Sequence, residues 1–223
     1  MLKAPPIKYI GHAPVAMRLR CLLLGWGSVG MVYGLTTALA GHLGAPTVLR
    51  ETALDRWLPF NPAAIWAYLL FFVLIPYAYA VVRSDRLRPL QHAMQLSALL
   101  CGAVFLAWPT TLVYPPVAGQ GASLAMLRLL LVADTPYNCL PSLHGALTLL
   151  CMAALTERQR PWHTAAVWML GAGICVSVVV LRRHLSGDLA AGLAVAAGSL
   201  YGVAWLRNKG LRQSINLGRK GVS

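Results

Sequence analysis

The sequence contains few charged residues and very few acidic ones. Asp, Glu, Lys and Arg together make up 11% of the 223 residues, and only 6 of them are Asp or Glu. Soluble domains usually carry about 25% charged residues, and here 58% of the residues are hydrophobic, so a water-soluble globular fold is excluded. The mean hydropathy of +0.63 also excludes intrinsic disorder, which requires low hydrophobicity. The composition indicates a single integral membrane domain formed by residues 1–223.

Cysteine is too sparse to form a disulfide framework, and the strong basic charge is wrongly distributed for nucleic-acid binding. Most of the 5 Cys lie inside apolar runs, where they behave as small buried hydrophobic residues. The net charge is +13, but the cations lie in short segments between apolar runs and form no basic face on a soluble domain. We therefore expect membrane lipids, and no nucleic acid, as partners.

Long apolar runs are what the sequence does contain, and six of them are candidates for membrane-spanning helices. A helix needs about 20 mostly apolar residues to cross the hydrocarbon core. The candidate segments are 21–42, 64–82, 93–108, 139–155, 164–181 and 186–206. The fourth is short, and Pro109 ends the third. The sequence therefore predicts an all-α polytopic membrane protein, a six-transmembrane-helix bundle.

The basic residues predict the orientation of this bundle. An even number of spans puts both termini on one side, and 14 of the 19 Lys and Arg residues fall on that side. The excess places the termini and a loosely ordered basic tail, 207–223, in the cytoplasm. Loops 43–63, 109–138 and 182–185 then face outward. An Ala-rich, Leu-rich and Arg-rich composition points to a bacterial inner membrane, with these loops in the periplasm.

A signal peptide is the alternative interpretation of the first apolar run. Ala38-Leu39-Ala40 resembles a signal-peptidase site. However, the preceding apolar run is longer than the usual 7–15 residues and its basic region is long. Cleavage would also leave five spans and spoil the charge distribution, so we favour an uncleaved first span.

Two polar segments lie at the outward ends of the fourth and sixth predicted spans. One reads Asn-Cys-Leu-Pro-Ser-Leu-His-Gly at 138–145, and the other reads Arg-Arg-His-Leu-Ser-Gly-Asp at 182–188. Ionisable residues at membrane depth are costly and are usually functional. The two segments are therefore the candidate site.

The first segment has the features of a helix start that can bind an anion. Pro141 suits a first helical turn, since the N–H that it lacks would have no partner there. Asn138 or Ser142 can cap the helix. The free N–H groups of the first turn attract anions, and His144 follows within that turn.

The second segment supplies an acid, a base and cations. His184 and Asp188 are four residues apart and share a face of a helix, so the carboxylate can hold the imidazole and support its positive charge. Arg182 and Arg183 match the oxygens of a phosphate group. Together the two segments suit phosphoryl transfer, with one histidine as the nucleophile and the other as the general acid.

These segments resemble the motifs of a known enzyme superfamily. Pro141-Ser142-Leu143-His144 is similar to the Pro-Ser-x-His element of the type 2 phosphatidic acid phosphatase superfamily, and His184-x-x-x-Asp188 is similar to the end of its last motif. Residues 183–188, together with Trp-Pro and Tyr-Pro-Pro at 108–116, look most like the inositol phosphorylceramide synthase branch. The resemblance covers about 108–206.

The sequence also departs from the superfamily pattern. The first motif, Lys-x6-Arg-Pro, is absent, because there is no lysine between Lys8 and Lys209. The arginine expected six residues before the last histidine is replaced by Val178. Arg182, Arg183 or Arg128 could supply the missing phosphate-binding cation.

The resemblance implies a lipid phosphatase or phosphotransferase that acts through a phosphohistidine. His184 would attack the lipid phosphate and Asp188 would orient it, while His144 would protonate the leaving oxygen. The cations and Ser142 would bind the phosphate oxygens. No cofactor or metal is implied, although His144, His184 and Asp188 are possible metal ligands by type.

Two alternatives stay open at this point, and neither the lipid nor the oligomeric state is specified. The first is a transferase that moves a phospho-headgroup between lipids. The second is a transporter or scaffold without catalysis, which would place charges along a path across the bilayer. The first, second, third and fifth predicted spans contain no such charge in their interiors, which favours an enzyme.

Overall fold

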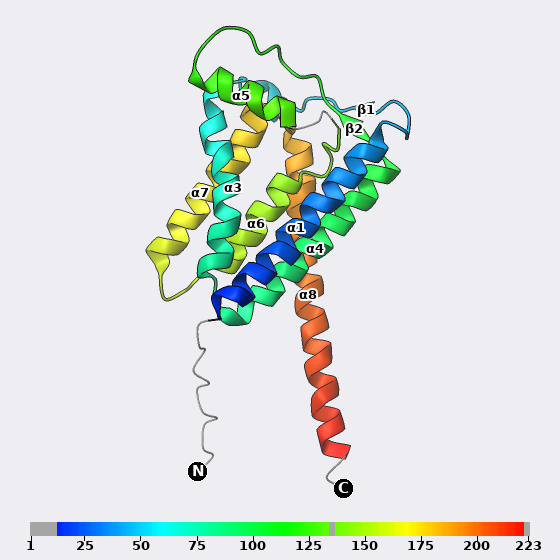
Figure 1. The fold of residues 1–223 in the computed structure, drawn as a ribbon, viewed down its shortest axis with the longest axis vertical. Helices are drawn as coiled ribbons and strands as arrows, with labels where there is room; N and C mark the ends of the chain where they lie inside the picture. The colour runs from blue at the N-terminus through cyan, green and yellow to red at the C-terminus, as the bar shows by residue number, and fades with distance from the viewer. Residues whose placement is uncertain (1–12, 134–136, 221–223) are drawn as a thin grey trace.

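The computed structural model describes residues 13–133 and 137–220, and these residues are mostly helical (Figure 1). The helices are α1 (Val15–Ala40), α2 (Ala53–Trp57), the 3-10 helix η1 (Pro62–Ala64), α3 (Ile65–Val81), α4 (Ser84–Ala107), α5 (Ala122–Ala133), α6 (Leu143–Leu155), α7 (Pro161–Val180) and α8 (Ser186–Lys220). Strands β1 (Thr47–Val48) and β2 (Thr110–Thr111) pair in parallel, Thr47 with Thr110. Apart from this short pair, the predicted all-α fold is confirmed.

The helices form a bundle of membrane-spanning length. Five of them are long and apolar enough to cross a membrane: α1, η1 with α3, α4, α7 and the first part of α8. The fourth predicted span, 139–155, is wrong at its beginning, since α6 has 13 residues and begins at Leu143. At 1.5 Å per residue, α6 is about 20 Å long, less than the hydrocarbon thickness. Six full spans were predicted, and the described residues instead form five helices of spanning length and the shorter α6.

Two helix ends also differ from the prediction. Helix α4 begins at Ser84 instead of residue 93, because its first turns are polar and hydropathy detects only the apolar remainder. The tail 207–223 was expected to be loosely ordered, and this is wrong for 207–220, where α8 continues to Lys220. That stretch contains no proline, the residue that breaks a helix interior most strongly.

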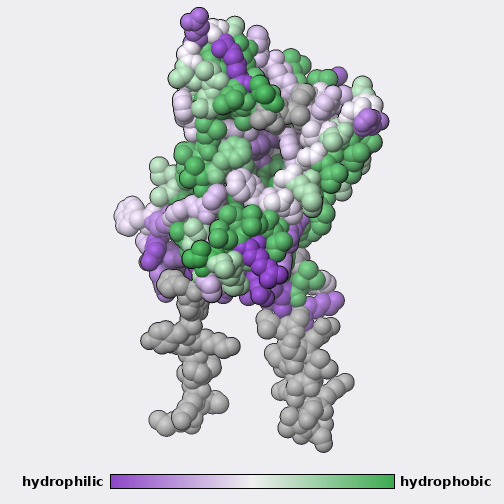
Figure 2. Space-filling view, in the orientation of Figure 1, coloured by the Kyte–Doolittle hydropathy of each residue, from purple (hydrophilic) through white to green (hydrophobic). Residues whose placement is uncertain are grey.

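The apolar core surrounds α6. Buried residues from α3, α4, α6 and α7 pack into one cluster that includes Ala78, Met94, Leu147 and Ile174. Other large apolar side chains, such as Leu23 on α1, lie on the outer surface. Figure 2 shows hydrophobic residues along the helices and hydrophilic residues gathered towards the two ends. Such a surface suits lipid more than water, as expected for a helical membrane bundle.

The beginnings of α6 and α8 are in direct contact. A Cβ atom on Gly192 would lie 2.1 Å from the carbonyl oxygen of Ser142, so only glycine allows the two backbones to approach this closely. The N–H of Ser142 also donates to the carbonyl oxygen of Asp188 at 2.9 Å. This contact joins the two polar segments that the sequence separates by 40 residues.

The two ends of the bundle differ in what they carry. Helix α1 begins and α8 ends at one end, which we call the terminal end (Figure 1). Helices α2 and α5 and the two strands lie at the opposite end, which we call the loop end. The candidate site lies towards the loop end, because α6 and α8 both begin there.

Candidate active site

Two histidines from the two polar segments lie side by side. His144 is in the first turn of α6, and His184 lies in the connection between α7 and α8. Nδ1 of His144 is 3.3 Å from Nε2 of His184, and the ring centroids are 5.4 Å apart. We call these two residues the histidine pair. The structure therefore brings together the two histidines selected from the sequence.

The tautomer of His184 follows from its partner. Nδ1 of His184 lies 2.7 Å from the backbone carbonyl oxygen of Cys139. A carbonyl oxygen only accepts, so Nδ1 carries the proton. In the neutral ring Nε2 is then unprotonated, and this is the nitrogen that faces His144. An unprotonated Nε2 is the form that a nucleophilic histidine requires.

Asp188 contacts His184 less directly than the spacing suggested. Its Oδ2 is 3.8 Å from Nδ1 of His184, which is an ion-pair distance and too long for a hydrogen bond. The same oxygen accepts a hydrogen bond of 2.8 Å from the N–H of Leu185 and so caps α8. The hydrogen bond that orients His184 comes from the Cys139 carbonyl, an acceptor that sequence reasoning missed because every residue has one.

Tyr68 on α3 completes the chain of contacts around the histidines. Its hydroxyl oxygen is 2.7 Å from Nε2 of His144, and the two rings lie 5.0 Å apart. Tyr68 is only 1% exposed. Sequence reasoning missed this residue, because a tyrosine in an apolar span is ordinary and nothing local marks its partner. A hydroxyl can donate to a neutral ring or accept from a charged one, so Tyr68 suits both states of His144.

An apolar cavity of about 280 Å³ opens beside His144. Tyr68 and Tyr33 contribute to its wall, and most of the rest is hydrocarbon from α1, α3 and α6. Such a lining suits an apolar ligand with a single polar end. An apolar ligand in this cavity would therefore lie next to the histidine pair.

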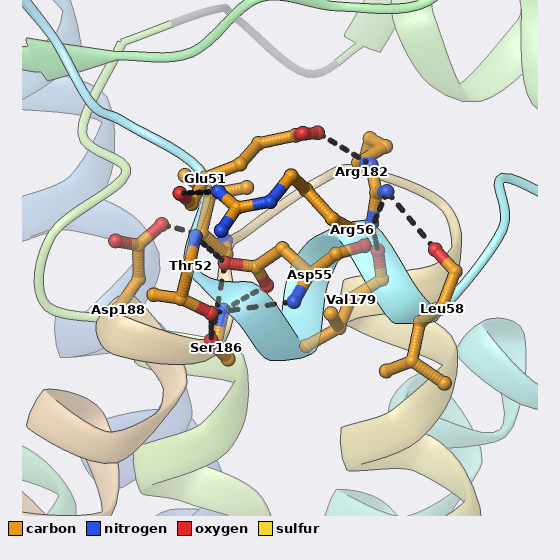
Figure 3. Close-up of polar contacts among 10 residues, drawn as sticks. Glu51, Thr52, Asp55, Arg56, Leu58, Val179, Arg182, Ser186 and Asp188 are labelled. Carbon is orange, nitrogen blue, oxygen red and sulfur yellow. Dashed lines mark hydrogen bonds and ion pairs between the residues drawn. The ribbon is translucent and has the colours of Figure 1, made fainter.

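Arg182 is used within the protein. Its guanidinium donates to the carbonyl oxygens of Asp55 at 2.6 Å and Leu58 at 2.9 Å, and Nε lies 3.2 Å from Oε1 of Glu51 (Figure 3). A further bond reaches the carbonyl oxygen of Val179. Its backbone has a φ of 53°, a costly conformation that fixed surroundings maintain. These contacts bind α2 to the end of α7.

Asp55 is a further residue that the sequence analysis missed. It is fully buried, and its carboxylate accepts from the N–H of Ser186 at 2.7 Å and from the N–H of Thr52 at 2.8 Å. Burial alone would raise the pKa of Asp55, but the hydrogen bonds from Thr52 and Ser186 outweigh it and lower the pKa. Thr52 and Asp55 form a capping box on α2, and the Thr-x-x-Asp spacing was the available signal.

We call Arg182, Glu51, Asp55 and Ser186 the arginine cluster. It lies directly beside the histidine pair along the chain, since Arg182 and His184 are two residues apart. Its donors and acceptors bond one another and the carbonyls of α2 (Figure 3). The arrangement fixes the start of α8 and, with it, the position of His184.

The three other predicted phosphate-binding residues differ in what their side chains contact. The Arg183 guanidinium stacks on the ring of Tyr114 at 4.8 Å, and the residue is 5% exposed. Ser142 caps α6, with Oγ accepting from the N–H of Gly145 at 3.3 Å. Arg128 on α5 is exposed and donates to the carbonyls of Val117 and Gly119. Arg183 and Ser142 therefore flank the histidine pair along the chain, and Arg128 is held by its own loop.

A larger and more polar cavity, which we call the outer cavity, is lined in part by Arg182 and Glu51 of the arginine cluster. Its volume is about 680 Å³, and its wall includes Arg50, Arg56 and Arg182 as well as Tyr114 and Leu185. Leu185 directly follows His184. The candidate site thus has an apolar cavity with His144 in its wall and a more polar cavity with Arg182 and Leu185 in its wall.

A metal site is not supported by the described residues. Within residues 13–133 and 137–220, no group of three or more His, Cys, Asp or Glu is arranged to hold a metal ion. We therefore propose none from His144, His184 and Asp188.

Comparison with known proteins agrees with the fold and the motifs. The sequence model of the PAP2 superfamily matches residues 40–202, more than half of the chain. The chain belongs to the PAP2 superfamily, whose membership supports a membrane enzyme acting on lipid phosphoesters. The match begins well before the motif-bearing part and takes in α3 and α4. No curated protein and no solved structure matches the chain.

Proposed function

We propose that this protein cleaves a lipid phosphoester inside the membrane through a phosphohistidine formed on Nε2 of His184. The observation that carries this proposal is the pairing of the two histidines, with Nδ1 of His184 bonded to the Cys139 carbonyl and Nε2 directed at His144. The apolar cavity beside His144 supports a lipid substrate, since it offers a place for hydrocarbon next to the reacting groups.

In the proposed first step, Nε2 of His184 forms a bond to phosphorus and the bond from phosphorus to the lipid oxygen breaks. Protonated His144 gives its Nδ1 proton to that leaving oxygen, and Tyr68 keeps the ring in place through Nε2. In the second step, neutral His144 takes a proton from water, whose oxygen attacks phosphorus and releases Nε2. Asp188, 3.8 Å from Nδ1, supports the positive charge of the phosphorylated imidazole.

The phosphate-binding groups follow from the contacts described above. We propose Arg183 as the main cation, because it adjoins His184 and its stacked guanidinium presents N–H groups in a plane that suits phosphate oxygens. Ser142 accepts through Oγ, so its hydroxyl proton can still donate. The first N–H groups of α6 add a positive dipole end. Arg182 and Arg128 are assigned to holding α2 and the α5 loop.

We also propose an orientation for the protein. The excess of Lys and Arg at the terminal end favours that end in the cytoplasm. The histidine pair would then face the periplasm of a bacterial inner membrane. Substrate would reach it from the outer leaflet.

Transfer to a second lipid or alcohol is the alternative reaction. The outer cavity of about 680 Å³ favours it, because an acceptor with a polar headgroup could lie there next to Leu185. The same phosphohistidine would then be attacked by an acceptor hydroxyl. The motif likeness to the inositol phosphorylceramide synthase branch is consistent with this reaction, which differs from hydrolysis only in the second step.

The test is a product analysis with labelled lipid phosphates. Purified protein in detergent is given a panel of lipid phosphate monoesters and phosphodiesters, with and without acceptor alcohols, and both free phosphate and new lipids are measured. We expect turnover of at least one lipid, and an acid-labile phosphoenzyme after rapid quenching.

Two controls make the result decisive. His184→Ala should lose the phosphoenzyme, whereas His163→Ala, which removes a histidine bonded to Tyr77 elsewhere in the bundle, should keep it. An acid-stable phosphoenzyme would contradict the phosphohistidine. Failure of the wild-type protein to turn over any lipid would instead support a transporter or scaffold.

A further inference from the structure

A second basic cavity lies at the terminal end, away from the histidine pair. It has a volume of about 430 Å³ and lies between α1 and α4. Arg20, Arg88, His92 and Gln91 form its polar wall, and Cys21 and Leu24 are among its apolar residues. The distance along α1 from Arg20 to its end at Ala40 is about 30 Å, which is the thickness of the hydrocarbon core. The cavity therefore lies near the opposite membrane surface from the loop end.

The two arginines that begin α1 have different surroundings. Arg18 donates to the carbonyl oxygens of Tyr79 and Val82, both at 2.9 Å, and so caps the end of α3. Arg20 makes no hydrogen bond or ion pair with the residues that the structure describes. Positions two apart on a helix point about 200° away from each other, so Arg20 is directed away from that cap and into the cavity.

The same alternation occurs at the beginning of α4. Arg86 donates to the carbonyl oxygens of Ala154 at 3.0 Å and Thr156 at 2.6 Å, at the end of α6. Within the described part of the chain, Arg88 has neither an ion pair nor a hydrogen bond. One arginine of each pair thus has a structural role. The other, which has no partner among the described residues, contributes its cation to one shared cavity.

The inner part of the cavity is closed by close helix packing. Nε2 of Gln95 donates to the carbonyl oxygen of Leu24 at 3.0 Å. A Cβ atom on Gly25 would lie 3.3 Å from Cα of Gln91, so α1 and α4 touch there. Leu24 is 44% exposed and continues the apolar surface of α1 towards the membrane centre. The cavity therefore has a basic mouth at the membrane surface and apolar side chains below it.

We propose that this cavity binds the phosphate headgroup of an anionic membrane phospholipid, with an acyl chain along the apolar face of α1. Two guanidinium groups from different helices can share one phosphate. Basic cavities between membrane helices at the cytoplasmic level suit such headgroups. The site is separate from the proposed catalytic site and does not depend on its chemistry. Its occupant holds α1 and α4 together as an integral part of the bundle.

The experiment measures lipid-dependent stability of the full-length protein. Detergent-solubilised protein is titrated with phosphatidylglycerol or with phosphatidylcholine of the same acyl chains, and the unfolding temperature and the number of bound lipids are recorded. The titration is repeated with His184→Ala, so that lipid cleavage cannot contribute. We expect phosphatidylglycerol to bind and stabilise at a much lower mole fraction than phosphatidylcholine.

The variants test whether Arg20 and Arg88 are responsible. Arg20→Gln/Arg88→Gln should need about 25-fold more phosphatidylglycerol, since each basic residue contributes about fivefold to headgroup affinity. Arg158→Gln/Arg160→Gln removes the same charge from the α6–α7 loop and should behave as wild type. Arg20→Lys/Arg88→Lys keeps the charge and should retain most of the preference, and it remains informative if the Gln variant does not fold.

Three outcomes would overturn the proposal. The first is an equal loss of affinity in the Arg158/Arg160 control, which would mean general surface charge. The second is unchanged phosphatidylglycerol binding in the Arg20/Arg88 variant. The third is equal stabilisation by soluble glycerol 3-phosphate, which would indicate a site for a water-soluble anion.

Discussion

The histidine pair and the arginine cluster each contain buried polar side chains, namely His184 in the first and Arg182 and Asp55 in the second. Both adjoin the start of α8, but their contacts differ in kind. In the histidine pair, each ring contacts groups that can exchange protons with it. The two imidazoles contact each other, and His144 also contacts the hydroxyl of Tyr68. In the arginine cluster, the Arg182 guanidinium is bonded to four acceptors within the chain. Neighbouring residues of one motif therefore have contacts that suit proton exchange in one case and contacts that hold elements together in the other.

The two helix N-termini at the site show the same contrast. The first N–H groups of α8 are taken by carboxylates, since Ser186 donates to Asp55 and Leu185 donates to Asp188. At α6, Ser142 supplies a neutral cap. An anion would be repelled by the acids at α8 and attracted at α6. The difference supports our proposal that the start of α6 binds phosphate and that the start of α8 positions His184.

The largest expected effect comes from the histidine pair itself. His184→Ala should abolish turnover of every substrate, because it removes Nε2, the nitrogen that we propose accepts the phosphoryl group. His144→Ala should lose less activity on an aryl phosphate than on a lipid alkyl phosphate, because an aryl leaving group needs little protonation. Steady-state rates on the two substrates measure this difference. Equal losses on both substrates for His144→Ala would remove it from the role of general acid.

Asp188 lies near His184 and also caps α8, and one substitution separates these two functions. Asp188→Asn keeps an oxygen that can accept from Leu185 but removes the negative charge near His184. By analogy with the orienting carboxylate of a catalytic triad, the rate should fall by about 10²–10⁴, while the unfolding temperature changes little. A stability loss with a normal rate would show that Asp188 acts only as a cap.

Tyr68 gives a smaller and more specific test of the histidine pair. Tyr68→Phe removes a hydrogen bond to His144 worth about 1–1.5 kcal/mol, so kcat should fall about tenfold. Tyr77→Phe is a matched control, because Tyr77 bonds His163 outside the site. The shape of the pH–rate profile should change only in Tyr68→Phe. Identical profiles would leave Tyr68 with a packing role alone.

Substitutions of Arg182 and Arg183 test the role of the arginine cluster directly. Arg182→Lys keeps the charge but cannot bond Asp55, Leu58 and Glu51 together. It should lower the free energy of unfolding by about 2–3 kcal/mol, as hydrogen bonds of a charged group are lost. Arg183→Lys should instead lower kcat/KM and leave the unfolding temperature almost unchanged. The reverse pattern would exchange the roles that we give to the two residues.

The smallest expected effect is the pH dependence from Asp55. Its pKa is lowered below the ordinary value of 3.8, so the ionised carboxylate stabilises the folded state fully above that pH. This stabilisation is lost as the pH falls through the folded-state pKa. The unfolding temperature of wild type should therefore drop more steeply in this acid range than that of Asp55→Asn. Parallel curves would show that Asp55 does not contribute.

Local chemistry explains how much could be predicted from the sequence. Apolar runs set the membrane class and the helical fold, because a spanning segment must satisfy its own backbone hydrogen bonds. The residue types and spacing of the two motifs selected His144, His184 and Asp188. Helix ends were less predictable, since hydropathy does not register polar turns such as those at the start of α4 and the continuation of α8 to Lys220.

The tertiary structure alone decided the partners. Arg182 bonds carbonyls more than 120 residues away, and His184 is oriented by the carbonyl of Cys139. Tyr68 meets His144 only because α3 packs against α6. Backbone carbonyls carry no sequence signature, and long-range contacts depend on how helices pack. The sequence by itself therefore determined which groups could do the chemistry, and the packing determined which arginines hold the site together and which groups lie beside the histidines.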